Sequence, residues 1–214
     1  MFVGRRTFVQ LAALSAGRAA LAHVIDVGDL GGLGTPDRFD ALAAGVPAEV
    51  LILRHAEQPT HGSQVHLSAI GRARAAALPR LFPARFAAPT VLFATRASKE
   101  SNRPVETLQP LAQALGLRID DRFPDEADAE LASTILTGAG YAGAHILICW
   151  HHGTIPALAA RLGAVHAPAR WPDAQYDHVW QLRYGAGAVT FDDRLAPLLP
   201  GDRGEDSASG PPRC

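Results

Sequence analysis

The chain has 214 residues, of which 48% are hydrophobic and 19% are charged, and its formal net charge is -1. A chain of this length and hydrophobicity buries a substantial core, which excludes a largely disordered protein. Twenty lysine and arginine side chains against 21 aspartates and glutamates exclude a generally basic surface for binding nucleic acid. Two cysteines exclude a disulfide framework and a thiolate zinc site. No apolar run reaches the roughly 20 residues that a transmembrane segment needs.

The two ends of the chain have compositions unlike that of the middle. Arg5 and Arg6 precede an apolar run that ends in small residues, so we expect residues 1–22 to be a twin-arginine signal for export to the periplasm or the medium. An N-terminal amphipathic helix in a cytoplasmic protein is the alternative. Residues 23–47 are turn-rich and are expected to form a surface lead-in, and residues 201–214 are expected to be disordered. The folded domain is therefore expected at residues 48–200.

Within this domain, apolar bursts alternate with helical patterns. In chain order they predict a strand at 50–53, a helix at 66–82, a strand at 91–93, helices at 103–115 and 127–136, a strand at 145–150, a helix at 155–162, and a hairpin of strands at 178–184 and 188–191. Pro110 lies inside the second helical pattern and predicts a kink or a later start there. The order predicts an α/β three-layer sandwich, with a mostly parallel open sheet, helices on both faces and an antiparallel hairpin at one edge.

Histidines follow two of the predicted buried strands directly. Arg54 and His55 come after the first strand, and His151 and His152 come after the strand at 145–150. Ligands of open α/β sheets bind beyond the carboxyl ends of the strands. If these two strands are parallel neighbours, Arg54, His55 and His152 meet in one crevice. Strand alternation predicts that His151 points the other way.

A helix start supplies a third set of polar residues. Pro104 suits the first turn of the helix at 103–115, which puts Arg103 beside free backbone N–H groups. A helix N-terminus that carries an arginine attracts phosphate by charge and by directed donors. Ser101 is a candidate for a further hydroxyl donor to that phosphate, as are Thr95 and Ser98.

Four segments in this order resemble the first branch of the histidine phosphatase superfamily, which has the phosphoglycerate mutase-like fold. They are LILRHAEQP, LSAIGRARAAALP, SNRPVETLQPLAQALGL and ILICWHHGTIPAL, and they span residues 50–162. Gly153 follows His152, so the His-Asp pair of the second branch is absent. The resemblance implies a phosphatase that hydrolyses a small-molecule or peptide phosphomonoester and needs no cofactor or metal. It also implies that His55 is the nucleophile, that Arg54 and Arg103 hold the phosphoryl oxygens, and that His152 is the second histidine of the site.

The chemistry of these residue types agrees with that implication. A neutral imidazole is a competent nucleophile, and adjacent arginines favour the neutral form by like-charge repulsion. The same arginines stabilise the charge of the phosphoryl group during transfer. The family's general acid is a carboxylate, and the candidates here are Glu57, Asp125 and Glu126, of which we select Glu57 and Glu126.

Three other functions stay open at this point. A phosphate- or partner-binding module without turnover would explain the lack of a clear acid. A phosphomutase needs segments that cover the substrate, and the connections here are short. A metal hydrolase would have to use His61, His66, His151 and His152, whose spacing matches no familiar set of ligands. Trp171, Tyr176 and Trp180 are expected to pack in the core or at an edge rather than line a pocket.

Overall fold

The structure is a computed structural model, and it describes residues 45–185 and 187–202. The expected export signal at 1–22 lies outside these residues, as do most of the expected lead-in at 23–47 and most of the tail at 201–214. These expectations stay predictions from the sequence. Within the part of the chain that is described, no helix is long and apolar enough to span a bilayer.

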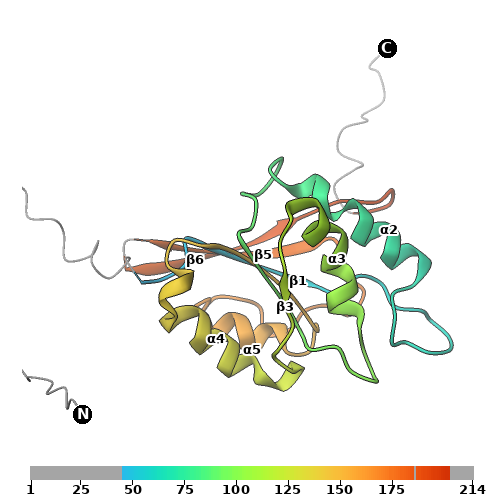
Figure 1. Cartoon of the computed structure of the whole chain (residues 1–214), viewed down its shortest axis with the longest axis horizontal. Helices are drawn as coiled ribbons and strands as arrows, with labels where there is room; N and C mark the ends of the chain where they lie inside the picture. Colours follow the sequence, from blue (N-terminus) through green and yellow to red (C-terminus); the bar gives the residue numbers. More distant parts are fainter. Residues whose placement is uncertain (1–44, 186, 203–214) are drawn as a thin grey trace, which may run out of the picture. The chain divides into compact units, whose positions relative to one another are not determined.

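A six-stranded mixed sheet forms the middle layer, with the strand order β3-β2-β4-β1-β5-β6 (Figure 1). The strands are β1 (Glu49–Arg54), β2 (Val91–Ala94), β3 (Ile119–Asp120), β4 (His145–Trp150), β5 (His178–Gly185) and β6 (Ala188–Leu195). Strands β1 to β4 are parallel to one another, whereas β5 is antiparallel to β1 and β6 is antiparallel to β5. This arrangement confirms the predicted fold class. The short strand β3 was not predicted, and β6 extends beyond the predicted residue 191.

Helices cover both faces of the sheet (Figure 1). In chain order they are α2 (Ala69–Ala77), α3 (Arg103–Leu115), α4 (Asp128–Thr137) and α5 (Ile155–Arg161), with short 3-10 turns η1 (Leu78–Leu81), η2 (Asp125–Ala127) and η3 (Ala139–Tyr141). The helix predicted at 66–82 is shorter because the Ser68 side chain caps it, accepting from the Gly71 N–H at 3.0 Å, and because its last part is a 3-10 turn. The later start that Pro110 suggested is wrong, since α3 begins at Arg103 and runs through Pro110 to Leu115.

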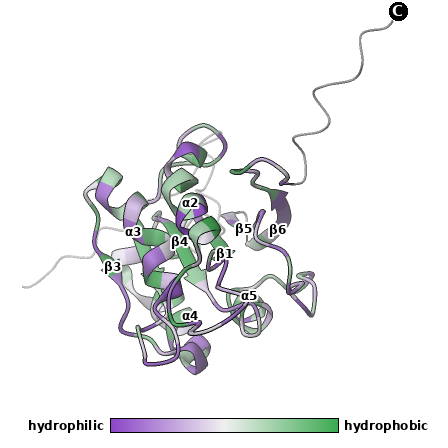
Figure 2. Cartoon of the chain, turned by 90° about the vertical axis from the view of Figure 1, so that its right-hand side faces the viewer, coloured by the Kyte–Doolittle hydropathy of each residue, from purple (hydrophilic) through white to green (hydrophobic). Residues whose placement is uncertain are grey.

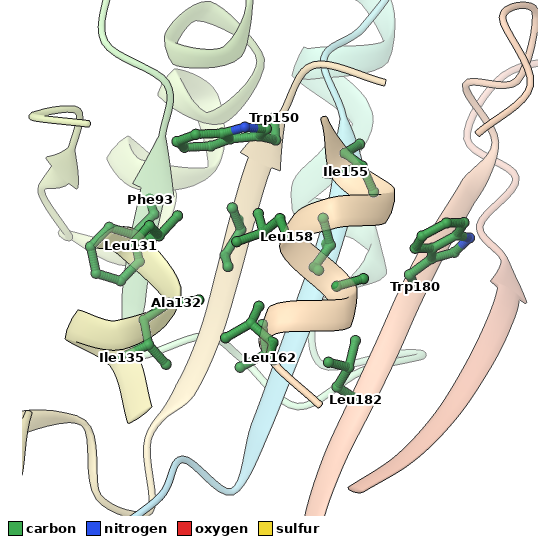
Figure 3. Packing of buried hydrophobic residues seen from close by; sticks show 14 of the residues in the cluster. Phe93, Leu131, Ala132, Ile135, Trp150, Ile155, Leu158, Leu162, Trp180 and Leu182 are labelled. Carbon is green, nitrogen blue, oxygen red and sulfur yellow. The ribbon is translucent and has the colours of Figure 1, made fainter. Parts of the chain in front are cut away.

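Each face of the sheet has its own hydrophobic core, because side chains alternate along a strand. Ile52, Ile148 and Trp150 belong to the first cluster, together with residues of α4 and α5. Figure 3 shows Trp150 and Leu158 in this core. Leu53, Leu147 and Cys149 belong to the second cluster, together with residues of α3 and η1. The apolar residues gather on the central strands (Figure 2). Trp171 and Trp180 are buried in the first core with ring centroids 4.9 Å apart, as expected.

The carboxyl ends of the central strands meet at one edge of the sheet. β1 and β4 are parallel neighbours, with Arg54 opposite Trp150, and β2 places Ala94 opposite Cys149. The residues that come next in the chain therefore leave the sheet at the same edge. They are His55 after β1, Thr95 after β2 and His151 after β4.

Candidate active site

His55 presents a neutral imidazole at this edge. It is 1% exposed, and its Nδ1 lies 2.7 Å from the Ala56 carbonyl oxygen. A carbonyl only accepts, so Nδ1 carries the proton and Nε2 keeps its lone pair. Nε2 faces the Nε of Arg103, which donates at 3.4 Å. Burial is the main reason that the pKa of His55 falls from 6.5 to about 2; the Ala56 carbonyl opposes the shift, and Arg103, His151 and Arg54 contribute to it.

Two buried arginines flank this imidazole. Arg54 is 5% exposed; its Nη1 donates to the Asp173 carbonyl oxygen, and its Cζ lies 4.2 Å from the centroid of the Tyr176 ring. Arg103 opens α3 and is 8% exposed. Burial lowers the pKa of both guanidinium groups, and the Tyr176 hydroxyl opposes that shift in both. An arginine keeps its charge in proteins, so two cations lie beside His55.

Several polar atoms around this edge have no partner in the protein. Among the described residues, Arg54 Nε, Arg103 Nη1, Thr95 Oγ1 and His152 Nδ1 are buried without a hydrogen bond. A buried donor without an acceptor costs on the order of 1–3 kcal/mol. Two of these atoms belong to guanidinium groups, which match the oxygens of a phosphoryl group. The edge is therefore suited to bind an oxyanion next to His55.

The second histidine in contact with His55 is His151, not the predicted His152. The rings of His55 and His151 lie edge to face, with centroids 5.1 Å apart and an interplanar angle of 69°. Strand alternation does not extend to His151, because β4 ends at Trp150. Beyond that residue the chain turns, and the His151 carbonyl already accepts from the N–H groups of Thr154 and Ile155 at 3.1 Å.

His152 lies nearer the rim of the site. Its Nε2 is 3.3 Å from a carboxylate oxygen of Asp173, and 35% of its side chain is exposed. Burial lowers the pKa of His152, and the charge of Arg54 lowers it as well. His152 therefore shares the electrostatic surroundings of Arg54, but its direct partner is Asp173.

Of the three candidate carboxylates, the structure brings Asp125 to the histidines. The Glu57 carboxylate is held by Arg74 at 2.8–3.1 Å, which ties it to α2. Glu126 is exposed on η2. Asp125 Oδ1 accepts from the Thr154 hydroxyl at 2.6 Å. Its charge also opposes the effect of burial, which lowers the pKa of both His151 and His152.

Ser101 and Thr107 lie at the start of α3. Ser101 is 7% exposed, and its Oγ accepts weakly from the Arg103 N–H at 3.4 Å. Thr107 was not predicted; its hydroxyl accepts from the Ala56 N–H at 2.9 Å and donates to the Arg103 carbonyl at 2.8 Å. One side chain therefore fastens the segment after His55 to the first turn of α3. Thr107 follows Arg103 by four residues, so both lie on the same face of α3. This spacing is the sequence signal that could have identified Thr107 as part of the site.

Tyr176 is a further residue of the site that the sequence did not predict. It was expected to pack in the core or at an edge, yet its ring covers the guanidinium of Arg54. No local pattern indicates this, because Tyr176 lies between α5 and β5 and meets Arg54 only in the fold. Within residues 45–185 and 187–202, no group of three or more histidine, cysteine, aspartate or glutamate side chains is arranged to hold a metal ion.

No family model matches the chain, and no curated protein matches it either. Solved structures do match. The protein histidine phosphatase SixA complexed with tungstate has a TM-score of 0.52 and 17% identity, over 69% of this chain and 97% of that chain. Mycobacterial glucosyl-3-phosphoglycerate phosphatase with inorganic phosphate has a TM-score of 0.47 and 18% identity, over 69% and 96%. Phosphoglycerate mutase from Bacillus anthracis str. Sterne has a TM-score of 0.48 and 12% identity, over 71% and 94%.

The fold rests on the first of these similarities, together with the strand order and the layers described above. The resemblance predicted from four sequence segments is thereby confirmed at the level of the fold. This chain has the phosphoglycerate mutase-like α/β fold that it shares with the SixA structure.

Proposed function

We propose that this protein is a metal-independent phosphatase that hydrolyses phosphomonoesters through a phosphohistidine on His55. The observation that carries this proposal is the state of the His55 imidazole. It is buried and neutral, its Nδ1 proton is committed to the Ala56 carbonyl, and its Nε2 faces Arg103. A nucleophile in this state needs no base to activate it.

In the first step, the lone pair of His55 Nε2 attacks phosphorus. The N–P bond forms as the ester P–O bond breaks, and the electron pair leaves on the alcohol oxygen. Arg54 and Arg103 stabilise the charge on the other phosphoryl oxygens. We assign the role of general acid toward the leaving alcohol to Asp125, in place of Glu57 and Glu126, because Asp125 is the carboxylate beside His151.

In the second step, water attacks the phosphoryl group. The N–P bond breaks, its electron pair returns to Nε2, and a water proton passes to the Asp125 carboxylate. Inorganic phosphate leaves, and both side chains return to their first state. The proton stays on Nδ1, which donates it to the Ala56 carbonyl oxygen throughout, and this keeps the ring in one tautomer.

The fold supports the same reaction. SixA, whose structure was solved with the oxyanion tungstate, is a protein histidine phosphatase. A binding module that holds phosphate without turnover is the alternative.

The test is turnover of 4-nitrophenyl phosphate by the full-length protein. The His55→Ala variant is expected to lose at least about a thousandfold in kcat, because it removes the attacking atom. Adding a chelator is expected to leave the wild-type rate unchanged. Rapid quenching of the wild type should trap a phosphoryl label that is stable in base and lost in acid, as an N–P bond is.

His166→Ala is the matched control, because this histidine is exposed and lies in the loop after α5. It should retain wild-type activity. Full turnover by a folded His55→Ala variant would contradict the proposal. Tight binding of inorganic phosphate without any hydrolysis would indicate the binding module instead.

A further inference from the structure

A second cleft, of about 490 Å³, adjoins the proposed phosphate site at Tyr176. The loop at residues 57–61 forms one part of its lining, and the start of α2, with Ala69 and Ile70, forms another. The cleft is wide and open to solvent, so a ligand enters it without any movement of the chain. Neither the nucleophile nor the phosphate-binding arginines line it.

Most of the surface that this cleft exposes is apolar, although Gln58, Thr60, His61 and Ser68 also line it. Ile70 is one of three large hydrophobic side chains that are exposed in the described part of the chain, at 61%, and Pro59 and the Tyr176 ring add apolar surface. Glu57 also lines the cleft, but its charge is compensated because Arg74 donates to both of its carboxylate oxygens. Apolar side chains in an open cleft can supply contact surface to an apolar part of a ligand.

Tyr176 joins the cleft to the phosphate site. Its ring lies 4.2 Å from the Arg54 Cζ, and its hydroxyl is close enough to Arg54 and Arg103 to influence the pKa of both. The same ring lines the cleft. Tyr176 is therefore shared by the cleft and by the surroundings of the Arg54 guanidinium.

We infer that this cleft binds the alcohol part of the phosphate ester, and that this part is a flat apolar group of the aryl type. The inference rests on the proposed phosphatase function. Ile70 and the Tyr176 ring supply apolar contact to such a group, while Arg54 and Arg103 hold its phosphate.

A polar leaving group such as glycerol would use a different place. A polar cavity of about 180 Å³ beside His152 is lined by Arg170 and Asp173. Arg170 is exposed there and offers a cation. If the leaving group binds in the cleft, substitution of Ile70 changes the substrate preference. If it binds in the polar cavity, substitution of Arg170 changes it instead.

The experiment compares 1-naphthyl phosphate with glycerol 2-phosphate in the full-length protein. For the Ile70→Ser variant, KM for 1-naphthyl phosphate should rise about fivefold, as expected when part of an apolar contact is lost. KM for glycerol 2-phosphate should not change. Val165→Ser is the matched control, because Val165 is 77% exposed and does not line the cleft, and it should leave both KM values unchanged. The Ile70→Leu variant, which keeps an apolar side chain, should have the KM values of the wild type.

A binding measurement separates failure of this inference from failure of the proposed function. Naphthyl fluorescence reports the Kd of 1-naphthyl phosphate for the His55→Ala variant, with or without Ile70→Ser. The second substitution should weaken naphthyl phosphate binding about fivefold and leave competition by inorganic phosphate unchanged. This result would support the cleft even if the wild type hydrolyses neither ester.

Two outcomes overturn the inference. One is that Ile70→Ser leaves both the Kd and the KM of the naphthyl ester unchanged. The other is an equal effect on naphthyl and glycerol esters, because a specific apolar contact cannot act on both. Selective loss with Arg170→Ala on the glycerol ester, and none with Ile70→Ser on the naphthyl ester, would assign the leaving group to the polar cavity.

Discussion

The imidazole rings of His55 and His151 meet edge to face at 5.1 Å, although 95 residues separate them in the chain. The contact depends on the parallel pairing of β1 with β4, which brings the residues after Arg54 and after Trp150 to the same place. Burial lowers the pKa of both histidines, so two neutral rings share this edge with the charges of Arg54 and Arg103.

The two histidines after β4 should differ in their effect on turnover. His151→Ala is expected to lower kcat about a hundredfold, because it removes a polar group that contacts the nucleophile. His152→Ala should act mainly on KM, by less than about tenfold, because His152 is paired with Asp173 at the rim. Steady-state kinetics with 4-nitrophenyl phosphate checks both values. A larger loss of kcat in the His152 variant would restore the assignment made from the sequence.

The activity should persist in acid. Burial lowers the pKa of His55 to about 2, so the nucleophile stays neutral well below its ordinary range. The value of kcat/KM, corrected for titration of the substrate phosphate, should therefore change less than about twofold from pH 7 to about pH 4 on account of this group. The measurement is a pH profile of kcat/KM. A tenfold loss per pH unit that begins near 6.5 would mean that His55 has the pKa of an exposed histidine.

A buried ion network should contribute strongly to stability. Arg74 donates to Glu57 and to Asp202, at 2.7–3.1 Å, and both Arg74 and Asp202 are largely buried. Arg74→Ala leaves two carboxylates without their cation, so the free energy of unfolding should fall by about 3 kcal/mol. Urea unfolding measures this change. Arg80→Ala, at an exposed position of η1, is the control and should change it by less than about 0.5 kcal/mol.

The same network predicts a pH dependence of unfolding. Burial opposes the shift, but Arg74 and the N–H groups of Leu198 and Leu199 lower the pKa of Asp202 to about 2. A carboxyl whose pKa is lower in the folded state contributes stability above its unfolded value, and this is lost as the pH falls through the folded value. The wild type should lose this contribution between about pH 4 and pH 2. The Arg74→Ala variant should show a weaker dependence over the same interval, and equal slopes would contradict the assignment.

Gly71 should not tolerate even a methyl group. A Cβ at this position of α2 would lie 2.2 Å from the Glu57 carbonyl oxygen, which is backbone and cannot move aside alone. Gly71→Ala is expected to destabilise the protein by about 2–3 kcal/mol, although alanine is the better helix former. It should also lower kcat, because Glu57 is two residues from His55. Gly140→Ala, where a Cβ would meet nothing within 4 Å, is the control for thermal unfolding and for turnover.

Local patterns in the sequence were sufficient for the architecture. The strands at 50–53, 91–93 and 145–150 are continuous apolar runs, and such runs are stable only between two layers of helices. The three-layer sandwich follows from these apolar runs. The edge of the sheet at which Arg54 and His55 emerge follows from them as well. The helix at 103–115 is found at its predicted residues because Pro104 begins it and Gly116, with a φ of 66°, ends it.

Only the tertiary structure decided which of two adjacent candidate residues faces the site. His151 and His152 are adjacent, as are Asp125 and Glu126, and a turn of the backbone after Trp150 or within η2 changes which one points inward. Tyr176 reaches Arg54 from a segment with no regular pattern. Periodicity predicts side-chain direction within a strand or helix, but beyond its end the direction depends on contacts with distant parts of the chain. The sequence by itself therefore determined the sheet and the position of His55, while the partners of His55 were decided by how the loops pack at the sheet edge.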